Sequence, residues 1–483
     1  MVGGGSYQWT PVLGRDLMLH EHLRGSTFML YDIDPKPLPA LQKLMRKIAS
    51  AAGTGFKVKA TTDPSEAFTG ADYAILSITT GGYDMMEHDL MIPAEYGIYQ
   101  TVGDTVGPGG LVRALRNVPV IVEIGRLMEK YCPDAWMLNL TNPMTILTRS
   151  FLRETSIKTV GLCHELFGTM ELLLEIFGLE NQSNLAGDSL MGVERMLDAE
   201  GGHLWQREMS IEVGGINHCI WMTKLNVRGE DGFELLHKFL AAPEKFAAKM
   251  PPPPGKTKRE KGSVALMMQN HQLKLDLFKT YNCLPAAGDR HVAEFYPYLL
   301  HNEKYAAERF GFGPYTIAWQ RDIRAMFMKW LKWWNTGKMP LNMERSEELA
   351  SDIVVALAGG RPVNAIVNRP NLHQIANLKK NAVVESMALV DAGGIHPFAI
   401  GNMPPAVSNL LSRHVMNQEM TIDAALNGDR NMALQILLND PLTRDLDDAA
   451  KMLDEMLKAT KQYLPRFFKK PGKTPRQKKT TKK

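Results

Sequence analysis

The chain has 483 residues, of which 45% are hydrophobic and 22% charged, values ordinary for a globular protein with two domains of sizeable core. It contains no apolar run of transmembrane length, and its four cysteines show no paired spacing, which favours free thiols and a reducing, cytoplasmic location. The net charge of +4 depends on nine Lys or Arg in residues 466–483; without them it is −5, so we expect a solvated, disordered tail and no membrane or nucleic-acid partner.

Strand and helix patterns alternate through the first part of the chain. Short apolar runs predict strands over 27–31, 73–79, 135–140 and 159–162, and 3.6-residue periodicity predicts helices over 39–52 and 118–131. Such alternation is typical of a parallel, doubly wound sheet. We therefore expect an α/β, Rossmann-type nucleotide-binding domain over residues 1–195, with ligands at the C-terminal ends of its strands.

The second part has a different pattern. Two β-type runs between residues 209 and 227 flank Gly214-Gly215, and helical runs follow near 263–279, 345–358 and 446–463. A Pro/Lys-rich loop is expected over 250–262. We expect a helix-rich α+β domain for catalysis and oligomerisation over residues 196–465, followed by the basic tail over 466–483.

A glycine cluster opens the chain and suggests a dinucleotide site. The G-x-G-x-x-G pattern is met at two of its three glycines, because Gln8 occupies the third position. Asp32 ends the next strand, where a carboxylate binds ribose hydroxyls and repels a 2′-phosphate, so NAD is favoured over NADP; alternatively, Asp32 only starts a turn. The residues expected to contact the cofactor are Gly3, Gly5, Ser6, Asp32, Thr79 and Gly81.

The first strand of this sheet is nearly absent from the sequence. In a doubly wound sheet the strand before the glycine loop is central. Only Met1 and Val2 precede Gly3. We therefore expect a further apolar, β-branched segment upstream.

Two residues far apart in sequence suggest a metal site. Cys163 ends a predicted strand, and His218 follows the Gly214-Gly215 turn. Each residue alone is more often part of a core, but thiolate and imidazole are transition-metal ligands. A site with only two protein ligands leaves positions for substrate and water, as catalytic metals require.

Three further segments carry polar groups with two interpretations each. In Gly288-Asp289-Arg290-His291, Asp289 is either a helix cap or a base beside an anion-binding Arg290. The glycine-rich residues 103–111 form a flexible lid or a linker. Asn142 binds a sugar or ribose hydroxyl, or only shapes a turn.

Six short motifs together resemble those of glycoside hydrolase family 4, over residues 3 to about 465. They are Gly3-Gly4-Gly5-Ser6, Gly107-Pro108-Gly109-Gly110, Thr141-Asn142-Pro143, Cys163-His164-Glu165-Leu166, Gly215-Ile216-Asn217-His218 and Gly288-Asp289-Arg290-His291. The resemblance implies a lactate/malate-dehydrogenase-like fold, NAD, and a divalent metal, usually Mn²⁺. It also implies a homodimer or homotetramer acting on a small glycoside.

The resemblance further implies an oxidation–elimination route, unlike the usual two-carboxylate hydrolysis. NAD oxidises C3 of the sugar, and the metal at Cys163 and His218 polarises the new carbonyl. Asp289, or alternatively Tyr281, then removes the C2 proton. Elimination at C1, addition of water and return of the hydride complete the cycle, with His164 as the candidate acid toward the leaving oxygen.

The segment that begins at Cys163 also indicates the substrate class. Cys163-His164-Glu165-Leu166 is closest to the Cys-His-Glu-Val form of α-galacturonidases, although Leu166 departs from it. The α-galactosidases and α-glucosidases of the family usually have serine at the position of Glu165, and they remain alternatives. A metal-free NAD-dependent hydroxy-acid dehydrogenase and a sugar-binding protein without activity are further alternatives. The residues expected to bind substrate are Asn142, Glu165, Asn217 and Arg290.

Overall fold

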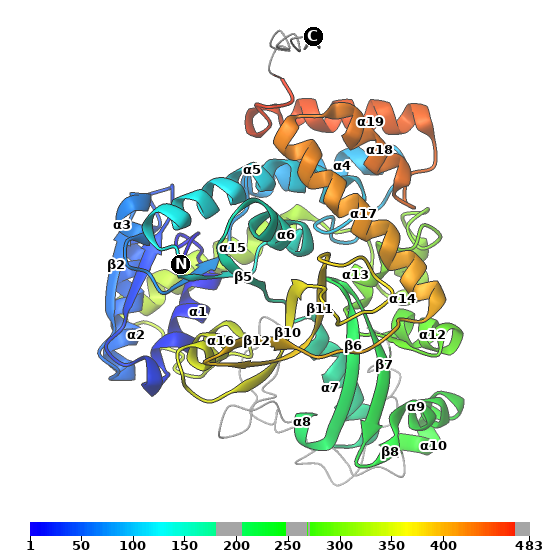
Figure 1. Cartoon of the computed structure of the whole chain (residues 1–483), viewed down its shortest axis with the longest axis horizontal. Coiled ribbons are helices and arrows are strands. Elements are labelled where there is room, and N and C mark those ends of the chain that lie inside the picture. The colour runs from blue at the N-terminus through cyan, green and yellow to red at the C-terminus, as the bar shows by residue number, and fades with distance from the viewer. Residues whose placement is uncertain (180–204, 248–267, 269–270, 469–483) are drawn as a thin grey trace, which may run out of the picture.

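The structure, a computed structural model, describes residues 1–179, 205–247, 268 and 271–468 (Figure 1). The predicted 250–262 loop, the predicted boundary between residues 195 and 196, and the tail from residue 469 lie outside the described residues. In Figure 1 the N-terminal elements lie on the left, strands β6 and β7 on the right, and helices α17 to α19 above them.

The N-terminal part contains the four predicted strands and one, over residues 57–61, that was not predicted. Strands β1 (Thr27–Tyr31) and β2 (Lys57–Thr61) pair in parallel, and so do β3 (Tyr73–Leu76), β4 (Trp136–Asn139) and β5 (Lys158–Gly161). Val2 forms parallel bridges to Tyr31 on one side and to Leu76 on the other. The residues just before the glycine cluster therefore occupy the central place between β1 and β3, as a doubly wound sheet requires. The predicted fold class is confirmed.

Helices pack on this sheet through apolar faces. In α2 (Leu38–Ala52), Leu41, Leu44, Met45 and Ile48 are buried at helical spacing, and the helix ends at the left-handed Gly53. The other helices of this part are α1 (Trp9–Met18), η1 (Glu21–Leu23), α3 (Pro64–Phe68), α4 (Gly82–Glu95), α5 (Gly107–Tyr131), α6 (Met144–Glu154) and α7 (Glu165–Phe177).

Helix α5 starts at Gly107, whereas the sequence predicted a helix from residue 118. The prediction treated the Gly/Pro-rich residues 103–111 as a loop. Pro108 is in the first turn of the helix, where a missing N–H costs little. Gly109 and Gly110 are buried, and a Cβ atom on Gly110 would lie 2.7 Å from the carbonyl oxygen of Thr105. The glycines thus serve close packing at a helix start.

The parallel sheet continues into an antiparallel one. Asn368 of β10 (Val363–Pro370) pairs with Gly161 of β5, where a Cβ on the glycine would meet the Asn368 side chain at 2.9 Å. In the described part of the chain the strand order is β3-β4-β5-β10-β11-β6-β7-β8. The added strands are β6 (Met209–Ile216), β7 (Cys219–Val227), β8 (Glu230–Asp231), β9 (Leu284–Pro285), β11 (Val383–Asp391) and β12 (Gly394–Pro397).

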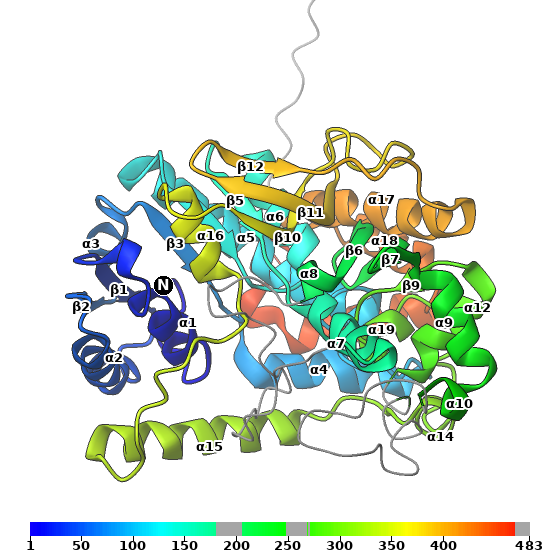
Figure 2. The same ribbon diagram turned by 90° about the horizontal axis from the view of Figure 1, so that it is seen from below.

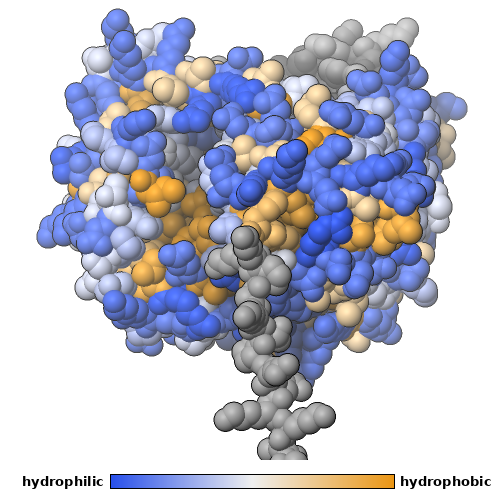
Figure 3. Space-filling view, turned by 90° about the horizontal axis from the view of Figure 1, so that it is seen from above, coloured by the Kyte–Doolittle hydropathy of each residue, from blue (hydrophilic) through white to orange (hydrophobic). Residues whose placement is uncertain are grey.

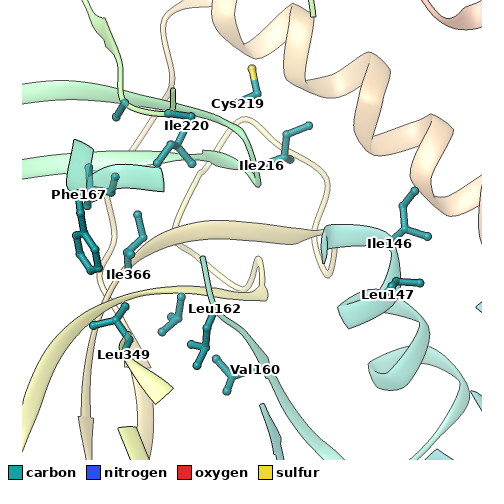
Figure 4. Packing of buried hydrophobic residues seen from close by; sticks show 14 of the residues in the cluster. Ile146, Leu147, Val160, Leu162, Phe167, Ile216, Cys219, Ile220, Leu349 and Ile366 are labelled. Atoms are coloured by element: carbon teal, nitrogen blue, oxygen red, sulfur yellow. The ribbon is translucent and has the colours of Figure 1, made fainter. Parts of the chain in front are cut away.

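A hydrophobic cluster joins the two kinds of sheet (Figure 4). It draws residues from α6, β5, α7, the β6–β7 hairpin and β10, and none of those labelled in the figure is more than 4% exposed. Burying each large side chain contributes about 1.5–3 kcal/mol. The labelled residues are Ile146, Leu147, Val160, Leu162, Phe167, Ile216, Cys219, Ile220, Leu349 and Ile366.

The remaining helices surround this sheet. Helix α15 (Ile317–Thr336) runs along one side of the N-terminal part, next to α2 and α4 (Figure 2). No helix in the described ranges combines the length and apolarity of a membrane span. The face in Figure 3 is mostly hydrophilic, with apolar patches between hydrophilic residues. The helices not yet named are α8 (Trp205–Glu208), α9 (Gly232–Ala241), α10 (Pro243–Ala247), α12 (Gln272–Tyr281), α13 (Asp289–Ala293), α14 (Tyr305–Phe310), α16 (Ala350–Leu357), α17 (Pro405–Asn427), α18 (Arg430–Asn439), α19 (Leu446–Ala459) and η2 (Lys461–Tyr463).

Candidate active site

The glycine cluster, residues 3–6, forms a tight turn that we call the nucleotide loop. Gly3 has φ 84°, and a Cβ there would lie 1.9 Å from the carbonyl oxygen of Ser77. Gly5 N donates to Asp32 Oδ2 at 2.8 Å, and Ser6 Oγ accepts from Trp9 N at 3.0 Å in the first turn of α1. Glycine is therefore required at Gly3, and a bulkier residue there would displace the backbone.

Asp32 shapes a turn, one of the two roles that the sequence suggested, and it also contacts the nucleotide loop. Its Oδ2 holds Gly5 of the nucleotide loop, while its Oδ1 accepts from Asp34 N at 3.0 Å and so shapes the turn after β1. The turn after β3 lies next to the loop, through the close approach of Gly3 and Ser77. In that turn Thr79 O accepts from Gly82 N, and Gly81 is left-handed at the start of α4. The predicted cofactor residues are thus neighbours.

A second group of side chains lies at the ends of other segments. One ligand atom each of Asp104, His218 and His291 lies within 4.8 Å of the others, and we call these three residues the ligand cluster. Asp104 precedes α5, His218 is in the β6–β7 turn with φ 66°, and His291 is on α13. The rings of His218 and His291 are 3.7 Å apart between centroids. The predicted ligand His218 therefore has two partners that were not predicted as ligands.

Thr105 determines which nitrogen of His218 can bind a metal. Its hydroxyl donates to Asp104 Oδ1 at 2.7 Å and lies 2.6 Å from His218 Nδ1. Because the Thr105 hydroxyl donates its hydrogen bond to Asp104, its oxygen accepts one from Nδ1–H of His218. The lone pair of His218 is then on Nε2, the arrangement found when a second group orients a metal-ligating histidine.

Burial and neighbouring charges shift the pKa values of the three residues in the ligand cluster. Burial, together with the charge of His291, lowers the pKa of His218 to about 3, so its imidazole is neutral. Burial opposes ionisation of His291, but Glu165, Asp104 and Glu294 outweigh it and raise the pKa of His291 to about 9. Burial likewise opposes ionisation of Asp104, yet the two histidines lower its pKa. The cluster therefore presents a carboxylate, a neutral imidazole and an imidazolium at pH 7, and His291 would release its proton on binding a metal.

Cys163 lies beside this cluster rather than in it. Burial, and then the carboxylates of Glu385 and Glu165, raise the pKa of its thiol. Glu165 contacts His291 Nε2 at 3.5 Å through Oε1, and Asn217 Nδ2 donates to Glu385 Oε2 at 3.0 Å. Among the described residues, the compact group of metal-type ligands does not include Cys163. The thiol is nevertheless linked to it through Glu165 and through Asn217, the neighbour of His218.

The donor set fits a divalent transition metal. Two imidazoles and a carboxylate that leave coordination positions open are typical of catalytic metals, and a thiol nearby adds a soft ligand. Within the described ranges the buried atom His291 Nδ1 has no hydrogen-bond partner, and neither has Asn217 Oδ1. Such orphaned atoms indicate that a further group completes the site.

The loop before α5 is part of residues 103–111, which were expected to form a flexible lid or a linker, and hydrogen bonds to two carboxylates hold it. Val102 N and Gly103 N donate to Glu294 Oε1 at 2.8 and 2.7 Å, and Gly107 N donates to Asp440 Oδ2 at 3.0 Å. Both carboxylates are buried. They hold the loop so that it delivers Asp104 to the cluster.

The structure brings three of the predicted substrate residues to the cluster. Asn142 Nδ2 donates to Asp104 Oδ2 at 2.9 Å, and Glu165 Oε2 accepts from Gly288 N at 2.8 Å. Asn217 directly precedes His218 in the β6–β7 turn. Arg290, by contrast, has an exposed side chain, although its backbone oxygen accepts from Thr101.

The predicted acid and bases lie further out. His164 Nδ1 is 3.0 Å from Glu348 Oε1 and stacks on Trp9 of the nucleotide side. Asp289 is buried and accepts from Leu273 N at 2.8 Å and from Lys274 N at 3.3 Å, which caps α12. The predicted cap of the following helix is therefore wrong: Asp289 is the first residue of α13, and its carboxylate instead accepts from the first turn of α12.

Tyr281 packs among aromatic rings. Its ring centroid is 5.2 Å from that of Trp221 and 6.5 Å from that of Tyr296. Sequence reasoning missed other members of the site, above all Glu385, Glu294 and Glu348. Glu385 is separated from its partner Asn217 by 168 residues, and no local pattern marks it.

Comparison with known proteins places these observations in context. Residues 1–179 match the model of family 4 glycosyl hydrolases, and residues 213–443 match the model of their C-terminal domain. The chain is 36% identical over 467 residues to an α-galacturonidase of Bacillus subtilis strain 168, covering 95% of this chain and 97% of the relative. It is 35% identical over 477 residues to an α-galacturonidase of Thermoanaerobacterium saccharolyticum, covering 96% and 95%.

Solved structures of glycosidases also match this chain over nearly its full length. The crystal structure of lplD from Bacillus subtilis matches with a TM-score of 0.79 and 33% identity, covering 94% of this chain and 98% of that one. A 6-phospho-β-glucosidase from Thermotoga maritima, solved with manganese, NAD⁺ and glucose-6-phosphate, matches with a TM-score of 0.72 and 22% identity, covering 96% and 98%.

Proposed function

The chain belongs to family 4 of the glycosyl hydrolases, and we propose that it hydrolyses α-galacturonides with NAD and with Mn²⁺ or another divalent transition metal. The observation that carries the substrate class is the near full-length likeness to α-galacturonidases, at 33–36% identity. An α-galactosidase and an α-glucosidase are less similar, at 30% and 26%. The segment Cys163-His164-Glu165 supports the same class.

The residues for both cofactors follow from the site. The nucleotide loop would hold NAD, with Asp32 at the ribose. The ligand cluster would hold the metal, with Cys163 as a further ligand. The manganese and NAD⁺ named with the Thermotoga maritima relative support this choice. When bound, NAD supplies a hydride acceptor for the sugar, and the metal supplies Lewis-acid polarisation of the carbonyl that results.

The chain's own residues would move the protons. Asp289 is the candidate base toward C2, since burial, offset by Lys274, raises its pKa to about 6. Tyr281 is the alternative. Although burial opposes its ionisation, Glu348 and Glu165 raise the pKa of His164 to about 9, so His164 is a proton donor toward the leaving oxygen at pH 7.

The proposal extends to organisation and location. We assign residues 1–195 to cofactor binding, 196–465 to catalysis and oligomerisation, and 466–483 to a solvated tail. The four cysteines are unpaired, which supports a reducing, cytoplasmic compartment. Membership of the family supports a homodimer or homotetramer.

The test is proton exchange at C2. The protein is incubated in deuterium oxide with NAD, Mn²⁺, a thiol reductant and p-nitrophenyl α-D-galacturonide, and the released galacturonate is examined by NMR. We expect deuterium at C2 and no net NADH, because the cofactor is regenerated. Hydrolysis without deuterium would contradict the elimination route, and accumulating NADH would indicate a dehydrogenase. Loss of exchange in Asp289→Asn but not in Tyr281→Phe would assign the base.

A further inference from the structure

Helix α5 carries two buried arginines, one turn apart, with very different partners. Arg116 is 1% exposed and binds Asp89 twice, with Nη1 at 2.8 Å from Oδ1 and Nη2 at 2.5 Å from Oδ2. Arg113 is 8% exposed, and its Nε donates to Asn142 O at 3.2 Å. Its Nη1 contacts only Met86 Sδ at 3.6 Å, a weak acceptor.

Arg113 is thus a buried cation without an acid. Across the described ranges no carboxylate forms an ion pair with it, and its Nη2 has no hydrogen-bond partner. A charge taken out of water is costly unless a counter-charge satisfies it, which is what Asp89 does for Arg116. The weakly satisfied terminal nitrogens of Arg113 are therefore suited to bind an anion from outside the chain.

The anion must come from the active site, because Arg113 borders it. The residue that Arg113 holds through its backbone oxygen, Asn142, donates from its side chain to Asp104 of the ligand cluster. Asn142 Oδ1 is buried and has no partner within the described residues. A sugar at the ligand cluster would therefore lie within reach of Arg113.

Two anions enter this site, the cofactor phosphates and the substrate carboxylate. The phosphates belong at the nucleotide loop, at the start of α1, on the opposite side of β3 from β4. Arg113 instead contacts Asn142, in the turn after β4, beside the ligand cluster. A guanidinium whose Nη2 has no partner in the described residues, and whose Nη1 contacts only a thioether, can offer both nitrogens to the two oxygens of a carboxylate.

We propose that Arg113 binds the C6 carboxylate of the uronide substrate and sets the preference for uronides over neutral sugars. The inference rests on the proposed function. It moves to Arg113 the role that sequence reasoning gave to Arg290. An exposed guanidinium such as that of Arg290 is already hydrated and needs no anion, whereas the buried Arg113 does.

The experiment compares Arg113→Gln with the wild-type protein, both holding NAD and Mn²⁺. Calorimetry measures binding of galacturonate, galactose and NAD, and kinetics measure kcat/KM for the p-nitrophenyl α-galacturonide and α-galactoside. We expect Arg113→Gln to bind galacturonate about 100-fold more weakly, the loss of a charge-assisted pair. NAD affinity should change less than about 3-fold, and the ratio of uronide to galactoside activity should fall by about the same 100-fold.

Three further variants separate the alternatives. Arg126→Gln removes an exposed arginine from the same helix, paired with Glu129 at the surface, and is the matched control. A larger loss of galacturonate binding in Arg290→Gln than in Arg113→Gln would overturn the assignment. Arg113→Lys keeps the charge but not the fork, and an intermediate loss is expected even if Arg113→Gln folds poorly.

The outcomes also separate this assignment from the proposed function. An active wild type with unchanged Arg113→Gln removes only the role of Arg113. Loss of NAD affinity equal to the loss of galacturonate affinity would assign Arg113 to the cofactor instead. A wild type that neither binds nor cleaves galacturonides removes both proposals together.

Discussion

The nucleotide loop takes its shape from backbone contacts among residues 3–6, 32 and 77, whereas the ligand cluster draws side chains from segments around residues 104, 218 and 291. In the loop, the backbone itself is the binding surface, and side chains are mainly excluded from it. In the cluster, each group depends on others far away in sequence for its orientation and charge. A change in one region should therefore leave the ligand of the other bound.

The largest effect is expected from His218→Ala. Removing the neutral imidazole of the ligand cluster should lower activity by about 10³-fold and weaken Mn²⁺ binding, because the metal loses a ligand and its Lewis-acid effect. Affinity for NAD should stay near the wild-type value. His396→Ala, which removes a surface histidine paired with Asp391, is the control. Activity and manganese affinity equal to those of the wild type would separate His218 from the metal.

Gly3→Ala tests the other region. Its Cβ would lie 1.9 Å from the carbonyl oxygen of Ser77, so the backbone has to move and NAD should bind about 100-fold more weakly. The control is Gly25→Ala, which has a similar φ of 79° but no neighbour within 4 Å. That variant should cost only about 1–2 kcal/mol of stability. NAD titrations followed by fluorescence measure the difference, and equal losses in both variants would refute the steric explanation.

These two regions also differ in how far sequence predicts them. The loop, Asp32 and the flanking strands follow local patterns, and the fold class was therefore predictable. Cys163 and His218 were marked by strand ends and turns. Asp104 stood in a Gly/Pro-rich segment typical of loops, and His291 in a motif that a helix cap explained equally well.

The supporting acids had no local signal at all. Glu385, Glu294 and Glu348 are single residues whose partners are brought close only by tertiary packing. Arg113 could not be identified from the sequence either, because a helical sequence does not show which buried arginine forms an ion pair with an acid. Only the contrast with Arg116 in the folded protein makes it stand out.

Glu294→Ala should have a smaller effect than either ligand or glycine substitution. The substitution removes the carboxylate that accepts from Val102 N and Gly103 N. The loop that carries Asp104 is then held less firmly, although Asp104 itself is unchanged. We expect activity to fall about 10-fold through misplacement of the cluster. Glu294→Gln keeps an oxygen acceptor and should stay closer to the wild type in activity assays. If Glu294→Gln were less active than Glu294→Ala, the charge of Glu294, and not its hydrogen bonds to the loop, would be its role.

The smallest effect concerns pH. Burial raises the pKa of Glu294 to about 7, above its unfolded value, so the folded state holds this proton more tightly. Stability should then fall as pH rises from about 4.5 to 7, because ionisation is disfavoured in the fold. In metal-free protein, melting curves of Glu294→Gln should lose a few degrees less over this interval than those of the wild type. Parallel curves would show that Glu294 does not titrate there.

The most direct test of the central claim is to locate the metal. Crystals grown with NAD and soaked in Mn²⁺ should show, in an anomalous difference map, one strong peak at bonding distance from His218 and Asp104, on the side of Cys163. The same map should show NAD along the nucleotide loop. A manganese peak away from the ligand cluster, or none at saturating Mn²⁺ in a protein that still cleaves galacturonides, would contradict the account.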